Sequence, residues 1–271
     1  MNDLLRIRSL SKHYDGFDLR NVDLTVPAGS VVGFIGSNGA GKTTTIKAIL
    51  GLIYPDAGSI ELLGQNVGEH AGSKAIKDAK QRTGVVFDTC SFPEEMTVAS
   101  VGKLMSYSYD SWSPADFEQR LAQFQLPKSK TVKDLSRGMS MKLSLACALA
   151  HDPDLLILDE ATAMLDPRGR EQVMQTIHHL NKDLGITVVS ITHYMEEAAQ
   201  ADRVLVMSQG NVVMEGTPKE VFSQTEKVRS LRLDVPQAAE LRDELVKAGI
   251  PMPEGIIDTG ECAQALYELL K

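Results

Sequence analysis

The chain has 271 residues and a formal net charge of −8, enough for one large α/β domain or for a large domain with a small appendage. The acidic balance argues against a broad nucleic-acid-binding surface, which would carry clustered Lys and Arg in excess. Its three cysteines, Cys90, Cys147 and Cys262, match no metal or disulfide framework, which favours a reducing cytoplasmic compartment. No apolar run approaches the roughly 18 to 20 residues of a membrane-spanning helix.

The N-terminal region is predicted to form strands. Residues 5–10 and 19–26 alternate between apolar and polar side chains, with a turn at Asp15-Gly16 between them. Residues 31–35 are apolar and mostly β-branched, as in a buried parallel strand. Residues 44–50 can then form a helix that ends at Gly51.

Between that strand and that helix lies a glycine-rich phosphate loop (Walker A). Its residues are Gly36, Ser37, Asn38, Gly39, Ala40, Gly41, Lys42 and Thr43. The glycines let backbone N–H groups surround a phosphate, and the helix N-terminus at Thr44 adds partial positive charge. Lys42 is expected to reach the β- and γ-phosphates of a nucleotide, and the Thr43 hydroxyl to ligate Mg²⁺. The alternative is a glycine-rich turn with an exposed lysine.

Further strands are predicted at residues 58–64 and 83–87, and we expect them to join the sheet that faces the nucleotide. From residue 94 to about 150 the composition becomes helical, with helices around 101–105, over 114–124 and over 139–150. Ser113 precedes Pro114, a typical N-cap and first-turn pair, and Ser136 is the candidate N-cap of the helix that runs through Ala150.

An apolar strand over residues 155–158 ends in two carboxylates, Asp159 and Glu160. Beside a phosphate loop their roles are expected to differ. Asp159 suits the Mg²⁺ shell, and Glu160 suits a general base that polarises the attacking water. The alternative is an acidic strand end that faces solvent.

The rest of the chain is predicted to hold a helix over 170–184, strands over 186–191 and 204–207, and a hairpin turn at 209–211. Alternating strands and helices favour a parallel sheet covered on both faces. After Pro218 short helices are expected over 219–222, 236–248 and 262–270, as an added module.

The order of five motifs resembles that of ATP-binding cassette (ABC) ATPases. They are the phosphate loop, the sequence Leu-Ser-Arg-Gly-Met at 135–139, the strand ending in Asp159-Glu160, Met-Leu-Asp at 164–166, and a lone His193. The resemblance covers roughly residues 4–216. It implies an α/β fold, with a P-loop NTPase core that has a parallel sheet and with an N-terminal antiparallel β subdomain. The ATPase domain would span residues 1–225 and contain an inserted helical subdomain over about 89–150. Residues 226–271 would form a small α-rich extension.

The resemblance also implies roles for single residues. Ser136 and Gly138 would cover the γ-phosphate held by a second ATPase subunit, in a head-to-tail homo- or heterodimer. His193 would contact the γ-phosphate, and Asp166 would organise the dimer seam. Tyr14 would stack on adenine; the alternative for Tyr14 is ordinary packing.

Two positions depart from the family pattern. Arg137-Gly138-Met139 stands where Gly-Gly-Gln is usual, and Asp88 follows residues 85–87 where Gln is usual. A carboxylate at that position can ligate Mg²⁺ but repels phosphate oxygens.

The resemblance implies a transmembrane permease as partner, and a location on the inner face of the cell membrane through that permease. Residues 88–112 are expected to line the groove for it, and two or three of six side chains there to supply the apolar surface: Phe92, Pro93, Met96, Tyr107, Tyr109 and Trp112. Residues 107–112 and the Leu-Ser-Arg-Gly-Met motif resemble small bacterial exporters. Residues 233–237 and 253–257 resemble energy-coupling-factor importers, in which the tail extends the dimer interface.

Two other functions stay open. The first is a soluble regulatory ATPase of the same superfamily that is not coupled to transport. Superfamily members that need a long coiled coil do not fit, because there is no room for one between Lys42 and Asp159. A module that traps ATP without turnover is favoured by Asp88 and opposed by Glu160 and His193.

Overall fold

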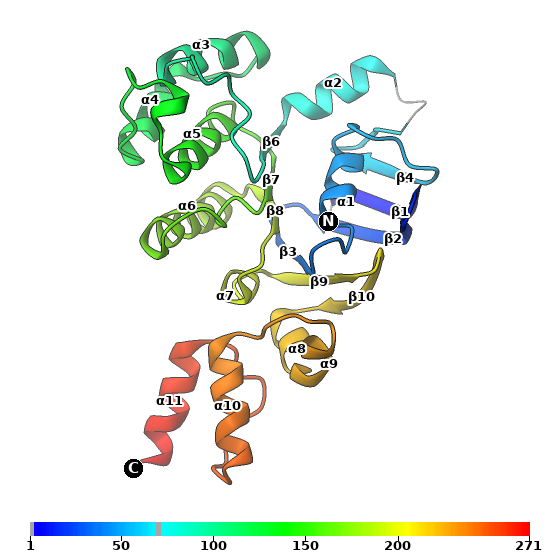
Figure 1. The fold of residues 1–271 in the computed structure, drawn as a ribbon, viewed down its shortest axis with the longest axis vertical. Coiled ribbons are helices and arrows are strands. Elements are labelled where there is room, and N and C mark those ends of the chain that lie inside the picture. The colour runs from blue at the N-terminus through cyan, green and yellow to red at the C-terminus, as the bar shows by residue number, and fades with distance from the viewer. Residues whose placement is uncertain (1–2, 69–71) are drawn as a thin grey trace.

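The computed structural model describes residues 3–68 and 72–271, which form two sheets and several groups of helices (Figure 1). The smaller sheet is antiparallel, in the order β2-β1-β4-β5. Its strands are β1 (Asp3–Tyr14), β2 (Phe17–Pro27), β4 (Ala57–Leu62) and β5 (Gln65–Asn66).

The larger sheet has the order β10-β9-β3-β8-β7-β6, and all its pairs are parallel except that of β10 with β9. Its strands are β3 (Val31–Gly36), β6 (Thr83–Val86), β7 (Leu155–Asp159), β8 (Thr187–Ile191), β9 (Arg203–Ser208) and β10 (Asn211–Gly216). The predicted α/β class and parallel core are therefore confirmed.

One predicted strand lies in the other sheet. The strand expected at 58–64 pairs with β1 in the antiparallel sheet instead of joining the nucleotide-facing sheet. The burial pattern gives the physical reason: β4 buries only Ile60 and Leu62, on one face, whereas every residue of β7 is buried. A strand with one exposed face suits an antiparallel sheet.

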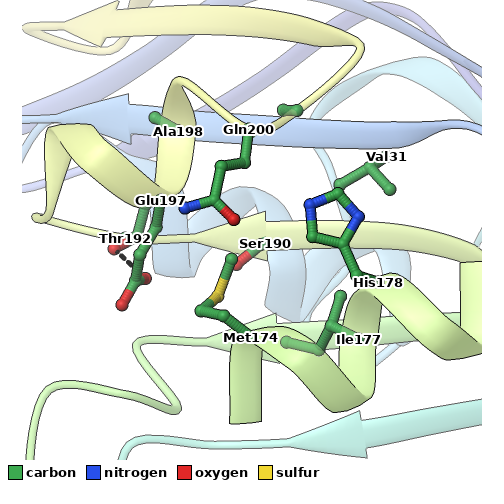
Figure 2. A pocket seen from close by; sticks show the side chains of 11 residues that line it. Val31, Met174, Ile177, His178, Ser190, Thr192, Glu197, Ala198 and Gln200 are labelled. Carbon is green, nitrogen blue, oxygen red and sulfur yellow. Dashed lines mark hydrogen bonds between the residues drawn. The ribbon is translucent and has the colours of Figure 1, made fainter. Parts of the chain in front are cut away.

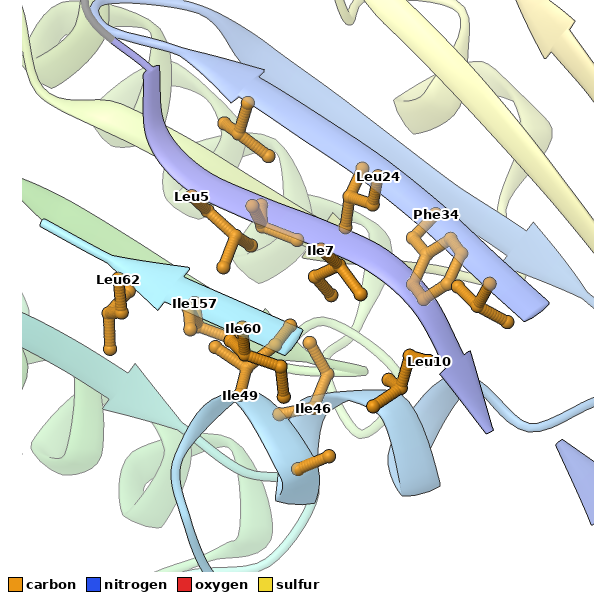
Figure 3. Close-up of a cluster of buried hydrophobic side chains, with 14 of the residues drawn as sticks. Leu5, Ile7, Leu10, Leu24, Phe34, Ile46, Ile49, Ile60, Leu62 and Ile157 are labelled. Carbon is orange, nitrogen blue, oxygen red and sulfur yellow. The ribbon is translucent and has the colours of Figure 1, made fainter. Parts of the chain in front are cut away.

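Helix α1 (Lys42–Ile49) lies between the two sheets and supplies the centre of the main core. Figure 3 shows Ile46 and Ile49 of α1 among Leu5 and Ile60 of the small sheet and Phe34 of the large one. The helix that follows the phosphate loop is thus held on both sides, which fixes its N-terminus.

Three helices form the group that leads away from β6, at the top of Figure 1: α3 (Val98–Ser108), α4 (Pro114–Gln123) and α5 (Arg137–Leu149). A short 3₁₀ turn, η1 (Val132–Asp134), precedes α5. Ser113 caps α4 by accepting a hydrogen bond from the Asp116 N–H at 3.2 Å, as predicted. Helices α2 (Ser73–Gln81), α6 (Pro167–Leu184) and α7 (Met195–Ala198) complete the core; α2 and α7 were not predicted.

The chain ends in four helices, and α10 and α11 pack together at the opposite end of the molecule from α3 (Figure 1). They are α8 (Pro218–Phe222), α9 (Thr225–Ser230), α10 (Gln237–Lys247) and α11 (Thr259–Leu269). A small separate core holds the last two together: Ala238, Met252, Ile256 and Cys262. Across residues 3–68 and 72–271, every helix is too short or too polar to cross a bilayer.

Candidate functional site

The phosphate loop joins the end of β3 to the start of α1 and forms an open cradle. Two glycines are required by geometry. A Cβ on Gly36 would lie 2.5 Å from the Met207 carbonyl oxygen, and Gly41 has a φ of 109°, where residues with a Cβ are strained. Gly41 is also the N-cap of α1, and it has no side chain to accept from the first-turn N–H groups. The helix N-terminus is therefore available to an anion.

Lys42 lies inside this cradle. Its Nζ donates to the carbonyl oxygens of Gly36 at 2.7 Å and Ser37 at 3.2 Å, and the residue is only 5% exposed. Burial lowers the pKa of Lys42, while the charges of Glu160 and Asp159 act in the opposite direction. The Lys42 ammonium group is thus held by the loop carbonyls, close enough to Glu160 and Asp159 to be influenced by their charges.

A pocket opens over the loop. It is lined by Gly16, Phe17, Asn38, Gly39, Ala40, Gly41, Lys42, Thr43, Thr44 and Glu160. Phe17, at the start of β2, contacts the space beside Gly41 and was not singled out from the sequence. Tyr14 lies at the end of β1, 39% exposed and outside this lining, with the Lys12 Nζ 5.8 Å from its ring.

Asp159 ends β7 with its carboxylate buried beside the cradle. Burial raises its pKa to about 6, and the charges of Glu160 and Asp88 add to that increase; a hydrogen bond from Thr43 and the charge of Lys42 lower it. Its Oδ1 is buried and has no hydrogen-bond partner among the described residues. An unpartnered carboxylate oxygen beside a threonine hydroxyl fits a Mg²⁺ site.

The described residues contain no group of three His, Cys, Asp or Glu side chains that could hold a metal by themselves. A Mg²⁺ ion here would need oxygens from the nucleotide and from water, as is usual for Mg²⁺ bound with phosphates.

Glu160 and His193 form a pair at the carboxyl ends of neighbouring strands. The His193 Nε2 lies 2.7 Å from the Glu160 Oε1, because β7 and β8 run parallel and end side by side. Glu160 has a φ of 54°, in the left-handed region that disfavours a residue with a Cβ, and its N–H donates to the Ile191 carbonyl at 3.0 Å. Strain of this kind is typical of functional sites.

Asp88 lies just beyond β6, the strand next to β7, and it is exposed. The charge of Asp88 adds to the raised pKa of Asp159. The pairing of β6 with β7 thus brings Asp88 to the acidic side of the cradle.

Ser136 and Gly138 lie at the N-terminus of α5 and are not among the residues that line the pocket. Ser136 caps α5, as predicted, by accepting from the Met139 N–H at 3.2 Å. This helix end lies beside the 164–166 loop: an Arg137 Nη1 is 3.8 Å from the Met164 sulfur, and a Cβ on Gly138 would lie 3.3 Å from Leu165. Asp166 caps α6 by accepting from the Gly169 N–H at 2.8 Å.

The six side chains expected to line a partner groove divide into two groups. Tyr107 is 76% exposed and Pro93 is also exposed. Phe92, Met96 and Trp112 are half-buried and pack on the core of the helical group, and Tyr109 stacks on His151 at a centroid distance of 3.8 Å. Two of the six are therefore open to a partner without rearrangement.

Comparison with known proteins agrees with this geometry. Residues 19–163 match the family model described as ABC transporter. The chain belongs to the ABC transporter family. ATP-binding cassettes of this family bind and hydrolyse ATP, so the chain is an ATPase subunit that powers membrane transport.

Three relatives of this ABC ATPase extend the comparison. The energy-coupling factor transporter ATP-binding protein EcfA1 of Symbiobacterium thermophilum is 38% identical over 93% of the chain and 88% of the relative. Its namesake in Geobacillus kaustophilus is 34% identical over 98% and 97%. The structure of cbiO1 from Clostridium perfringens, described as part of the ABC transporter complex cbiONQ, has a TM-score of 0.71 and 28% identity, over 90% of this chain and all of that one.

Proposed function

We propose that this ABC ATPase serves a transporter of the energy-coupling-factor type, and that two ATPase subunits close head to tail over ATP. The names of the relatives support the transporter type. The observation that carries the dimer is the division of the site: Lys42 and Glu160 line one pocket, Asp159 lies close to Lys42, and His193 contacts Glu160, whereas Ser136 lies away from this group at an exposed helix end.

The proposed roles follow from the contacts. Lys42 and the loop N–H groups hold the phosphates, and Thr43, Asp159 and Asp88 hold Mg²⁺, which when bound neutralises charge on the phosphate oxygens. Glu160 accepts a proton from the attacking water. His193 orients Glu160 through their 2.7 Å contact and donates to developing charge.

Tyr14 is proposed to stack on adenine, and Asp166 to face the partner ATPase subunit across the dimer seam. Both side chains are exposed in the single chain. Their exposure leaves them free to contact nucleotide and partner.

The second proposed partner is a transmembrane permease that holds the ATPase on the inner face of the cell membrane. The exposed Tyr107 and Pro93 are the proposed contacts on the helical group. The cbiO1 protein is described as part of the ABC transporter complex cbiONQ, which supports such an assembly here.

We further assign residues 1–225 to the ATPase domain, with a helical subdomain over 89–150, and residues 226–271 to an extension that supports dimerisation; residues 1, 2 and 69–71 lie outside the described structure. The extension exposes apolar side chains suited to an interface: Leu241, Val246, Ile250, Tyr267 and Leu269. Light scattering after size exclusion tests this role, since a nucleotide-free monomer at micromolar concentration would contradict it.

The decisive experiment for the ATPase site is Glu160→Gln. We expect steady-state hydrolysis to fall by about 10³-fold, because a general base contributes roughly 10² to 10⁴ in rate, while ATP and Mg²⁺ trap a stable dimer. Glu118→Gln, the same change at an exposed position of α4, is the matched control. Unchanged hydrolysis would exclude Glu160 as the base, and a wild-type chain that traps ATP without turnover would favour the ATP-trapping module.

A further inference from the structure

A buried carboxylate links the loops that carry Glu160 and His193. Glu197, in α7, is 7% exposed, and its Oε2 accepts hydrogen bonds from the hydroxyls of Thr162 at 2.9 Å and Thr192 at 2.6 Å. Thr162 follows Glu160 by two residues, and Thr192 directly precedes His193. Figure 2 shows the Thr192 hydroxyl directed at the Glu197 carboxylate.

The Thr192 hydroxyl also binds the backbone of the residue that follows His193. While it donates to Glu197, it accepts from the Tyr194 N–H at 3.0 Å. The backbone before and after His193 is thereby fixed to one hydroxyl. The loops after β7 and β8 are thus joined twice, once by the Glu160–His193 contact and once by the Glu197 carboxylate.

The contacts of Glu197 are not those of a stabilising ion pair. Its Oε1 lies 4.0 Å from the Arg170 Nε, and both atoms are buried without a hydrogen-bond partner among the described residues. Burial raises the pKa of Glu197, and only the two hydroxyls and Arg170 act against that cost. A buried, incompletely paired carboxylate is a poor source of stability, so its position calls for another reason.

We infer that Glu197 is a positioning residue for ATP hydrolysis: it fixes the 160–163 loop against the 192–194 loop and so sets the distance between Glu160 and His193. The inference rests on the proposed roles of those two residues. A carboxylate oxygen that accepts two hydroxyls is well suited to this task, because it constrains both loops with one rigid group.

The test compares Glu197→Ala with Glu197→Gln in the full chain. We expect Glu197→Ala to lower kcat on the order of 10²-fold, since misplacing a catalytic group by about 1 Å costs that much, with little change in KM for ATP. Glu197→Gln keeps an oxygen that can accept both hydroxyls, so it should retain most of kcat. Equal kcat losses in both variants, or a wild-type kcat in Glu197→Ala, would overturn the inference.

Two milder variants keep the test valid if Glu197→Ala does not fold. Thr162→Val and Thr192→Val each remove one hydroxyl, and each should lower kcat by about tenfold, the value of one hydrogen bond to a charged group. Thr83→Val is the matched control, because the hydroxyl of Thr83, at the start of β6, is equally buried but donates to the Ala79 carbonyl of α2. Losses no larger than that of Thr83→Val would refute the inference.

His193→Ala separates the inference from the function on which it rests. If His193→Ala keeps wild-type hydrolysis, the proposed role of His193 is wrong. If His193→Ala loses hydrolysis while Glu197→Ala keeps it, only the positioning role of Glu197 is wrong.

Discussion

Two helix N-termini in this molecule differ in what they offer to a phosphate. Helix α1 begins after Gly41, which has no side chain to cap it, and the charges of Asp159 and Glu160 act on Lys42 in its first turn. Helix α5 begins after Ser136, whose hydroxyl already accepts from the Met139 N–H, and the residue is exposed. The first N-terminus is built into a pocket, and the second lies on the surface.

The difference indicates that the two helix ends have separate roles in nucleotide binding. The α1 end holds a buried lysine and an unpartnered carboxylate oxygen, which a ligand would satisfy. At the α5 end the Ser136 hydroxyl caps the Met139 N–H, and this exposed end joins the proposed site only when a second subunit covers the nucleotide. A chain of this design is expected to turn over ATP as a dimer.

The strongest test of this division mixes two inactive variants. Lys42→Ala disables the cradle, and Gly138→Asp puts a negative charge at the α5 end, where only the flexible tip of Leu165 is near. Each alone should lose about 10²- to 10³-fold in kcat, the usual cost of a lost oxyanion donor. Mixed one to one, they should recover roughly a quarter of wild-type hydrolysis, because half of the dimers then contain one intact composite site. No recovery in dimers shown to be mixed would contradict action in trans.

Substitutions near the two helix ends should change the free energy of unfolding in opposite directions. The pKa of Asp159 is raised to about 6, so the folded chain favours its protonated form and loses stability as pH rises from about 4 to 6. Asp159→Asn should therefore stabilise the nucleotide-free chain by about 3 kcal/mol at pH 7.5, at about 1.4 kcal/mol per pKa unit. Ser136→Ala should destabilise it by about 1 kcal/mol through loss of the cap.

Chemical denaturation at pH 7.5 and pH 5 checks both changes. The gain from Asp159→Asn should be smaller at pH 5, and the loss from Ser136→Ala should be the same at both values. Asp78→Asn, at an exposed position of α2, serves as the control. A gain from Asp159→Asn that is independent of pH would show that charge is not its cause.

The two aromatic side chains near the cradle can be separated by nucleotide binding. Tyr14→Ala should weaken ATP binding by about tenfold, the typical value of one base-stacking contact, and should weaken inorganic triphosphate binding little. Phe17→Ala should weaken both, because Phe17 packs beside Gly41 of the loop itself. Titration with both ligands makes the comparison, and a Tyr14→Ala chain with wild-type ATP affinity would assign the adenine to Phe17 or to neither.

Asp88 provides the smallest expected effect. If its carboxylate helps to hold Mg²⁺ beside Asp159, then Asp88→Asn should raise the Mg²⁺ concentration for half-maximal hydrolysis by about fivefold, the value of one solvent-exposed charge contact of about 1 kcal/mol. Glu95→Gln, exposed and farther along the chain, is the control. A lower Mg²⁺ requirement would show that Asp88 chiefly repels the phosphates.

Local sequence was sufficient wherever a motif and its strand or helix lie together in the chain. The caps at Ser113 and Ser136, the buried β7 and the helix after the phosphate loop all follow from neighbouring residues and were predicted, although α1 begins at Lys42, two residues earlier than expected. Three helices were missed for local reasons as well: α7 and α9 have only four and six residues, and α2 buries little of its surface. The strand β4 was placed in the wrong sheet because its pairing with β1 depends on residues about fifty positions away.

The sequence by itself determined which groups could meet a triphosphate: the phosphate loop, the two carboxylates after an apolar strand, and a histidine at another strand end. Tertiary structure alone decided their geometry. Only the parallel pairing of β7 with β8 brings His193 to 2.7 Å from Glu160, and only the packing of α7 places Glu197 behind both loops. The physical reason is that residue type and spacing are local, whereas burial, raised pKa values and contacts between strand ends depend on which distant segments pack together.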